Sequence, residues 1–176
     1  MVGHSYGGVV ALLAAAARPE AVRSLTIIEP PALGLPPGTA EIRSLSDEIR
    51  RYRELGPSDP EQFLIGFLEI VGSTAQLPSP LPLALLQNAR LLMVERSPAE
   101  AVIPLDRLRK APFPKLVVSG AHSAAYDQIC DLLESGLGAE RAVIPGAGHS
   151  IPRIGAPFND RLEAFLRSVE AAQGSA

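Results

Sequence analysis

The stretch GHSYGG at residues 3–8 decides the expected fold, because glycines stand two positions before and two positions after Ser5. A Gly-x-Ser-x-Gly pattern is typical of a sharp strand–turn–helix connection that holds its serine in strained backbone geometry. The flanking residues approach each other closely in such a turn, so glycine at both positions avoids a clash of Cβ atoms. The turn would lift the Ser5 hydroxyl clear of the sheet. The Tyr6 backbone N–H would lie beside it, at a helix N-terminus that favours negative charge.

The rest of the sequence predicts helices and strands in an order typical of an α/β protein with a helical insertion. Apolar β-branched runs that end in turn residues predict strands, and apolar residues at steps of three and four predict helices. Strands and helices alternate at both ends of the chain, which favours a parallel sheet. The expected segments are a helix at 9–17, a strand at 22–28, helices within 41–103, a strand at 115–118, a helix at 124–134 closed by Gly136, a strand at 142–144 and a last helix from Pro157.

These patterns divide the chain into two parts of a core and an insertion between them. We expect core structure over residues 1–35, a helical lid over 36–112 and core structure again over 113–176. Apolar residues recur at helical spacing within the lid, and packing of the lid on the core explains this spacing. The same residues also suggest a hydrophobic substrate; they are Phe63, Phe67, Leu68, Leu85, Leu92 and Met93.

Composition and charge exclude several classes of protein. The chain has 176 residues, is 47% hydrophobic and carries a net charge of -3, so it can bury a core and offers no basic surface to nucleic acid. A single cysteine, Cys130, rules out an intramolecular disulfide and favours a reducing compartment. No apolar run is long enough for a membrane-spanning helix, and the run after residue 8 lacks the preceding positive charges of a signal peptide. We therefore expect a soluble, cytoplasmic protein without nucleic-acid or membrane partners.

Three short motifs together resemble the α/β-hydrolase superfamily: GHSYGG at 3–8, GAHS at 120–123 and GAGH at 146–149. The resemblance spans the chain but corresponds to the C-terminal part of the family fold only. It implies a parallel sheet with a helical cap, Ser5 as the nucleophile, His149 as the general base and the Tyr6 N–H as one oxyanion donor. His4 becomes a candidate for substrate binding and His122 a structural or pocket-lining residue. The resemblance implies no cofactor, and three histidines so far apart in the sequence predict no metal site.

The acidic partner of His149 is not where the family usually carries it. That position, after the strand at 115–118, holds Ser123, which is better interpreted as the cap of the following helix. Glu29 ends the preceding strand, a position that some members of the superfamily use for the acid. Asp127 lies one helical turn beyond Ser123 and would have to reach back. Glu29 is favoured over Asp127, and the absence of any acid stays open.

The position of the serine motif carries a further expectation. In the family several strands precede this motif, so the sequence is expected to be the C-terminal part of a hydrolase that begins at the end of the strand feeding Ser5. It would then lack the loop that supplies the second oxyanion donor and have little activity by itself. The strand around residues 25–28 would form an exposed apolar edge, through which two copies of the chain could pair.

A serine nucleophile indicates attack on a carbonyl carbon. The leading hypothesis is a serine hydrolase that acts on an ester, a thioester, a lactone or a C–C bond next to a ketone, in a small and apolar molecule. The alternative is an inactive remnant that binds a partner or dimerises. A third hypothesis is cofactor-free haloperoxidase activity, which would use the same residues.

Overall fold

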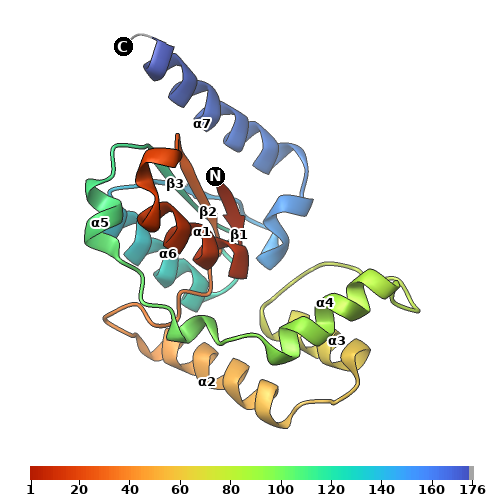
Figure 1. The fold of residues 1–176 in the computed structure, drawn as a ribbon. Helices are drawn as coiled ribbons and strands as arrows, with labels where there is room; N and C mark the ends of the chain where they lie inside the picture. The colour runs from red at the N-terminus through yellow and green to blue at the C-terminus, as the bar shows by residue number, and fades with distance from the viewer. Residues whose placement is uncertain (175–176) are drawn as a thin grey trace.

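The computed structural model describes residues 1–174, and within them a parallel sheet of four strands lies between helices (Figure 1). The strands are adjacent in chain order: β1 (Val2–His4), β2 (Leu25–Ile28), β3 (Lys115–Ser119) and β4 (Glu140–Val143). Each strand pairs in parallel with the next, for example Gly3 with Ile27, Ile27 with Val117 and Val117 with Arg141. The predicted α/β class with a parallel sheet is therefore confirmed.

Helices cover both faces of the sheet (Figure 1). Helices α1 (Tyr6–Ala17) and α6 (Ala124–Leu137) pack on one face, where Ile27 and Val117 join their apolar cluster. Helix α7 (Ala156–Gly174) packs on the other face, where Ile28, Leu116 and Val118 join a second cluster with Phe158 and Phe165. Because successive residues of a strand point to opposite faces, a strand buried on both sides is mostly apolar at consecutive positions. This holds at residues 116–118, and at residues 25–28 apart from the buried Thr26.

A helical segment connects β2 to β3 and lies beside the sheet (Figure 1). The first two of its helices begin at side-chain caps: Thr39 accepts a hydrogen bond from Ile42 N, and Asp59 accepts one from Gln62 N. The elements are α2 (Ala40–Leu55), α3 (Pro60–Ile70), α4 (Leu83–Val94), the short 3₁₀ helix η2 (Pro98–Glu100) and α5 (Leu105–Lys110). Two further 3₁₀ helices lie outside this segment, η1 (Pro19–Ala21) after α1 and η3 (Gly148–Arg153) after β4.

Several predicted boundaries were wrong. Helix α6 does not stop at Gly136; it runs to Leu137 and ends at Gly138, whose φ of 61° is the left-handed conformation that favours glycine. Ser123 stands at the N-cap of α6, but its side chain makes no capping hydrogen bond. The first predicted strand is shorter than expected, and the third begins earlier, at Glu140.

The predicted exposed edge was also wrong. Strand β2 is buried at all four positions, because β1 pairs with it on one side and β3 on the other. The strands at the two edges are β1, where Val2 is 49% exposed, and β4, where Val143 is 48% exposed. Within residues 1–174, no helix has the length and apolar character needed to cross a membrane.

Candidate active site

The carboxyl ends of all four strands meet at one edge of the sheet, as parallel strands require. Ser5 follows β1, Glu29 follows β2, His122 lies in the loop after β3 and His149 lies in the loop after β4. Three residues of these loops have a positive φ although they are not glycine: Ser5 (53°), Glu29 (41°) and Ala121 (52°). Such strained residues persist only where the surroundings fix them, and they gather at functional sites.

Ser5 occupies the sharp turn that the sequence predicts between β1 and α1. Its N–H donates to the Ile28 carbonyl at 2.9 Å, which anchors the turn to β2. A Cβ on Gly3 would overlap the Gly7 carbonyl oxygen and lie 2.8 Å from the Cβ of Ala11, so glycine is required there. A Cβ on Gly7 would meet nothing within 4 Å. The close approach therefore explains the glycine before the serine and not the one after it.

Gly3→Ala and Gly7→Ala form a matched pair that tests this packing. Gly3→Ala is expected to lower the free energy of unfolding by about 1–3 kcal/mol, because the added methyl group must displace the backbone of α1. Gly7→Ala is expected to raise it by about 0.5–1 kcal/mol, because alanine favours an open helical position. Urea unfolding of both variants measures the difference. Equal effects would contradict the proposed contact between β1 and α1.

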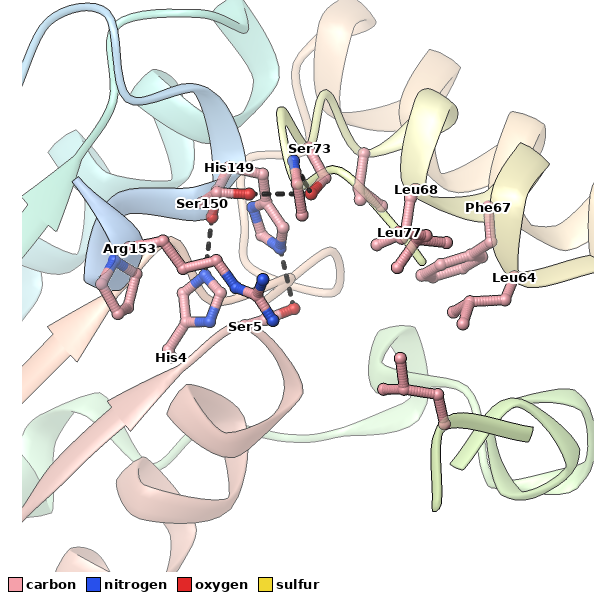
Figure 2. A pocket seen from close by; sticks show the side chains of 14 residues that line it. His4, Ser5, Leu64, Phe67, Leu68, Ser73, Leu77, His149, Ser150 and Arg153 are labelled. Atoms are coloured by element: carbon pink, nitrogen blue, oxygen red, sulfur yellow. Dashed lines mark hydrogen bonds between the residues drawn. The ribbon is translucent and has the colours of Figure 1, made fainter. Parts of the chain in front are cut away.

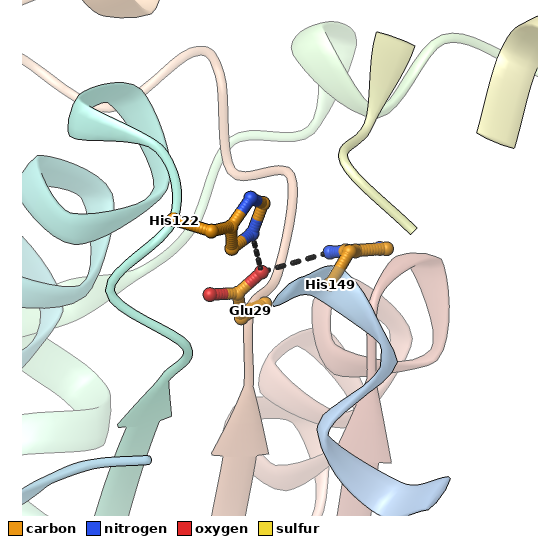
Figure 3. Close-up of side chains that lie close together, drawn as sticks. All are labelled: Glu29, His122 and His149. Atoms are coloured by element: carbon orange, nitrogen blue, oxygen red, sulfur yellow. Dashed lines mark hydrogen bonds and ion pairs between the residues drawn. The ribbon is translucent and has the colours of Figure 1, made fainter. Parts of the chain in front are cut away.

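A line of hydrogen bonds joins Ser5, His149 and Glu29. His149 Nε2 lies 2.9 Å from Ser5 Oγ (Figure 2), and His149 Nδ1 lies 2.9 Å from Glu29 Oε2 (Figure 3). Because a carboxylate only accepts, Nδ1 carries the proton and Nε2 is free to accept the Ser5 hydroxyl proton. His149 is 4% exposed and Glu29 is fully buried, so water does not compete for the central bond.

Glu29 is held by three donors. Its Oε2 accepts from His149 and also from His122 Nε2 at 2.7 Å (Figure 3), and its Oε1 accepts from the Gly120 N–H at 2.6 Å. Burial by itself would raise the pKa of Glu29, but hydrogen bonds from His122, His149 and Gly120 outweigh it and lower the pKa to about 2. The carboxyl group is therefore ionised throughout the range in which the protein is expected to work.

The depressed pKa of Glu29 predicts a specific acid sensitivity. Its pKa falls from the ordinary value of 4.5 to about 2 in the fold, so its contribution to stability is present above pH 4.5 and is lost as pH falls toward 2. When the pH falls from 5 to 3, protonation of this one group should lower the free energy of unfolding by about 2 kcal/mol. Glu29→Gln should show a loss smaller by that amount when urea unfolding is measured at both pH values. Parallel losses in both proteins would contradict the assignment.

The other sequence candidate for the acid, Asp127, and the position where the family usually carries it, Ser123, do not contact His149 in the part of the chain that the structure describes. Asp127 Oδ1 accepts from Ser119 Oγ at 2.6 Å and lies 3.8 Å from Arg141, on the α6 side of β3. Ser123 has no carboxylate and stands at the start of α6. Of the three positions considered, only Glu29 contacts His149 in the described residues.

His4 and Tyr6 flank Ser5. His4 Nε2 donates to the backbone carbonyl of His149 at 2.7 Å, which ties the turn after β1 to the loop after β4 (Figure 2). Burial, and after it the neighbouring His149, lower the pKa of His4, so its ring is neutral near pH 7. Tyr6 is the first residue of α1, so its N–H has no acceptor within the helix and is available beside Ser5.

Glu29, His122 and His149 lie close enough to consider as metal ligands, with their donor atoms within 4.8 Å of one another. The two nitrogens lie 2.7 and 2.9 Å from the same carboxylate oxygen. Tetrahedral zinc, with bonds of about 2.0–2.1 Å, spaces its ligands more widely than this. The arrangement fits hydrogen bonds.

The separation of the three histidines along the sequence did not predict their separation in space. The fold brings their rings together, with the His4 and His122 ring centroids 4.9 and 6.3 Å from that of His149.

A cavity of about 290 Å³ opens above Ser5 (Figure 2). Ser5, His4 and His149 form its floor, and apolar side chains of the helical segment form a wall, among them Phe67, Leu68 and Leu85. Of the other apolar residues expected at a substrate site, Phe63 is buried in packing and Leu92 packs against the cluster around Leu64 and Leu81. Three of the six residues therefore line the cavity, and Phe63, Leu92 and Met93 are not among its lining residues.

Sequence reasoning missed two residues of this site. His122 was expected to be structural or pocket-lining, and it donates directly to Glu29. Its place in a strand-end loop was the only available signal. Arg153 also lines the cavity, from the end of η3. Nothing in the sequence distinguishes it from the other arginines.

Comparisons with solved structures and families agree with this architecture. The chain matches a carboxylesterase structure from Nitrososphaera gargenis (18% identity, TM-score 0.63, 97% of this chain and 65% of that chain). It also matches a proline iminopeptidase from Mycobacterium smegmatis (18%, 0.60, 98% and 66%) and a thermophilic esterase from Thermogutta terrifontis (20%, 0.60, 96% and 64%). The chain thus spans less than two thirds of the length of these structures, and at such identities the likeness concerns the fold alone.

The sequence itself gives the family. The search of curated proteins found no significant match to this sequence. A family model described as "Alpha/beta hydrolase family" matches residues 1–167, which is nearly the whole chain. The chain therefore belongs to the α/β-hydrolase family.

Proposed function

We propose that this protein is a serine hydrolase that cleaves an ester or a related acyl compound by a Ser5–His149–Glu29 triad. The observation that carries the proposal is the unbroken hydrogen-bonded line from Ser5 Oγ through His149 to a buried, ionised Glu29, under a cavity of substrate size. Nucleophile, base and a group that orients the base in the correct tautomer are the parts that acyl transfer by serine requires.

The proposed reaction has two steps. Ser5 Oγ attacks the carbonyl carbon while His149 Nε2 takes its proton, and the Tyr6 N–H donates to the oxyanion of the tetrahedral intermediate. The intermediate collapses when His149 returns the proton to the leaving oxygen or sulfur, which leaves an acyl group on Ser5. Water, deprotonated by His149, then attacks this acyl group, and His149 returns the proton to Ser5 Oγ as the acid is released. Glu29 stays ionised throughout and stabilises the imidazolium that forms in each step.

Covalent labelling tests the nucleophile directly. A fluorophosphonate probe should bond to Ser5 Oγ with loss of fluoride, and peptide mapping by mass spectrometry should locate the label on the peptide that contains Ser5. Hydrolysis of 4-nitrophenyl butyrate should disappear in proportion to labelling. A chain that is folded by circular dichroism and takes up no label, or a label on another residue, would refute the proposal.

His122 is expected to act through Glu29 as a positioning residue. His122→Leu removes the donor to Glu29 Oε2, and a lost hydrogen bond to a charged group should lower kcat for an activated ester by roughly 10- to 100-fold with KM nearly unchanged. His122→Gln, which keeps an N–H donor, should recover part of the loss. A purely structural role would predict no such rescue, and an equal loss in both variants would contradict the assignment.

A further inference from the structure

The cavity above Ser5 has two chemically different sides (Figure 2). One side is apolar and comes from the helical segment, with Leu64, Phe67 and Leu68 from α3. The other side comes from the loop after β4 and carries Ser150 and Arg153. None of the described residues that line the cavity is acidic. A substrate that fills the cavity therefore meets an apolar surface at one end and a positive charge at the other.

The side chain of Arg153 is among those arginine side chains that have no carboxylate partner within the described residues. Six arginines form ion pairs with Asp or Glu side chains, namely Arg18, Arg50, Arg96, Arg141, Arg161 and Arg167. The Arg153 side chain has no ion pair or hydrogen bond to another residue within residues 1–174. Its guanidinium points across His4 toward Ser5 (Figure 2). The positive charge of Arg153 also contributes to the lowered pKa of His4, although burial and His149 contribute more.

The direction of the chemistry sets which part of a substrate meets Arg153. His149 must protonate the leaving group, so the leaving group lies on the His149 side of the carbonyl carbon. His149 and Arg153 belong to the same short helix, η3. The acyl group is then left with the apolar wall of α3, which suits a hydrocarbon chain or ring.

We propose that Arg153 selects substrates whose leaving group is anionic. Resting on the proposed hydrolase function, this defines the substrate class as esters or thioesters of an apolar acid with an alcohol or thiol that carries a carboxylate or phosphate group. The planar guanidinium pairs with either oxyanion through charge-assisted hydrogen bonds. Because the described lining residues include no carboxylate, no internal partner competes for it.

A pair of esters with the same acyl group tests this selection. 4-Nitrophenyl butyrate and 3-carboxy-4-nitrophenyl butyrate differ only in a carboxylate on the leaving group, and each kcat/KM is divided by the rate of alkaline hydrolysis of that ester. The readout is the ratio of the corrected values, carboxylated over neutral. Arg153→Gln is expected to lower this ratio about tenfold, and Arg153→Lys should lower it less, because the charge remains but the planar fork is lost.

Arg167→Gln provides the matched control. It removes the same charge from α7, where Arg167 is 75% exposed and pairs with Glu163, far from the cavity lining. The control should leave the ratio as in the unmodified chain. A ratio that is unchanged in Arg153→Gln, or that falls equally in Arg167→Gln, overturns the inference.

Binding without turnover separates this inference from the proposed function. In a Ser5→Ala background, the carboxylated ester should bind about tenfold more weakly when Arg153 is also replaced by Gln, as measured by ligand-observed NMR. If Ser5 takes the fluorophosphonate label but neither the ratio nor the binding depends on Arg153, the hydrolase stands and the anion selection fails. If labelling fails while binding depends on Arg153, the hydrolase fails and the anion site stands.

Discussion

Ser5→Ala is expected to abolish fluorophosphonate labelling and to lower kcat/KM for 4-nitrophenyl butyrate by roughly 10⁴- to 10⁶-fold. Among residues 1–174, the substitution removes the one side-chain oxygen within hydrogen-bond distance of His149 Nε2, at 2.9 Å, so no oxygen is left to receive the acyl group. The strained backbone at residue 5 should remain, because the Ser5 N–H bond to Ile28 does not involve the side chain. Thermal unfolding should therefore change little.

Ser123→Ala is the matched control for this loss. Ser123 also follows a central strand and stands at a helix N-cap, but its side chain makes no capping hydrogen bond. It also stands where the family usually carries the acid. The control should label at the rate of the unmodified chain. Residual labelling of Ser5→Ala at that same rate would show that the probe reacts at another residue and would contradict the proposed nucleophile.

The sequence predicted the fold well where one local pattern determines the structure. The Gly-x-Ser-x-Gly pattern at residues 3–7 predicts a strand, a turn and a helix, and the structure has β1, Ser5 and α1 in this order. Most residues of the runs at 25–28 and 116–118 are apolar and do not alternate with exposed polar residues, as is typical of strands buried on both faces. The carboxyl ends of these strands must share one edge, which brings Ser5 and Glu29 near each other before any side chain is placed.

Local patterns failed where a distant contact decides the outcome. Gly136 was predicted to end α6, but it lies inside the helix, where a Cβ would come within 3.1 Å of Leu105. The glycine there allows close packing of α5, and the left-handed Gly138 ends the helix instead. The edge strand was misplaced for a related reason: β1 has three residues, too few for a periodic pattern to reveal its pairing with β2.

The contacts of the candidate site were even harder to predict. His122 and Glu29 are 93 positions apart, and no spacing rule connects them. Their contact depends on the order of the strands in the sheet, since β2 and β3 are neighbours there although the whole helical segment separates them in the chain. Recognising Arg153 as a site residue also required the shape of the cavity, because it differs from the paired arginines only in its place in the fold.

Glu29→Gln is expected to lower kcat/KM for an activated ester by roughly 10⁴-fold with little change in size or shape. The Gly120 N–H fixes the amide oxygen of Gln at the Oε1 position, so the NH₂ group replaces Oε2. That NH₂ group then faces two N–H donors, from His149 and His122. His149 can relieve this conflict only by moving its proton to Nε2, which then points at Ser5 and cannot accept the hydroxyl proton. The expected loss of activity thus comes from the wrong tautomer of His149, and fluorophosphonate labelling of Ser5 should slow to a similar extent.

Asp127→Asn is the matched control for Glu29→Gln, because both variants replace a carboxylate by its amide beside the strand-end loops. Asp127 accepts from Ser119 and lies near Arg141, with no contact to His149 in the described residues. Its kcat/KM should stay within a few-fold of that of the unmodified chain. The reverse result, with Asp127→Asn nearly inactive and Glu29→Gln within tenfold of normal, would move the acid to α6 and require the carboxylate to turn back across β3. Normal activity of both variants would mean that His149 works without an acidic partner. That result would contradict the role inferred for Glu29 from its burial, its three hydrogen bonds and its contact with His149.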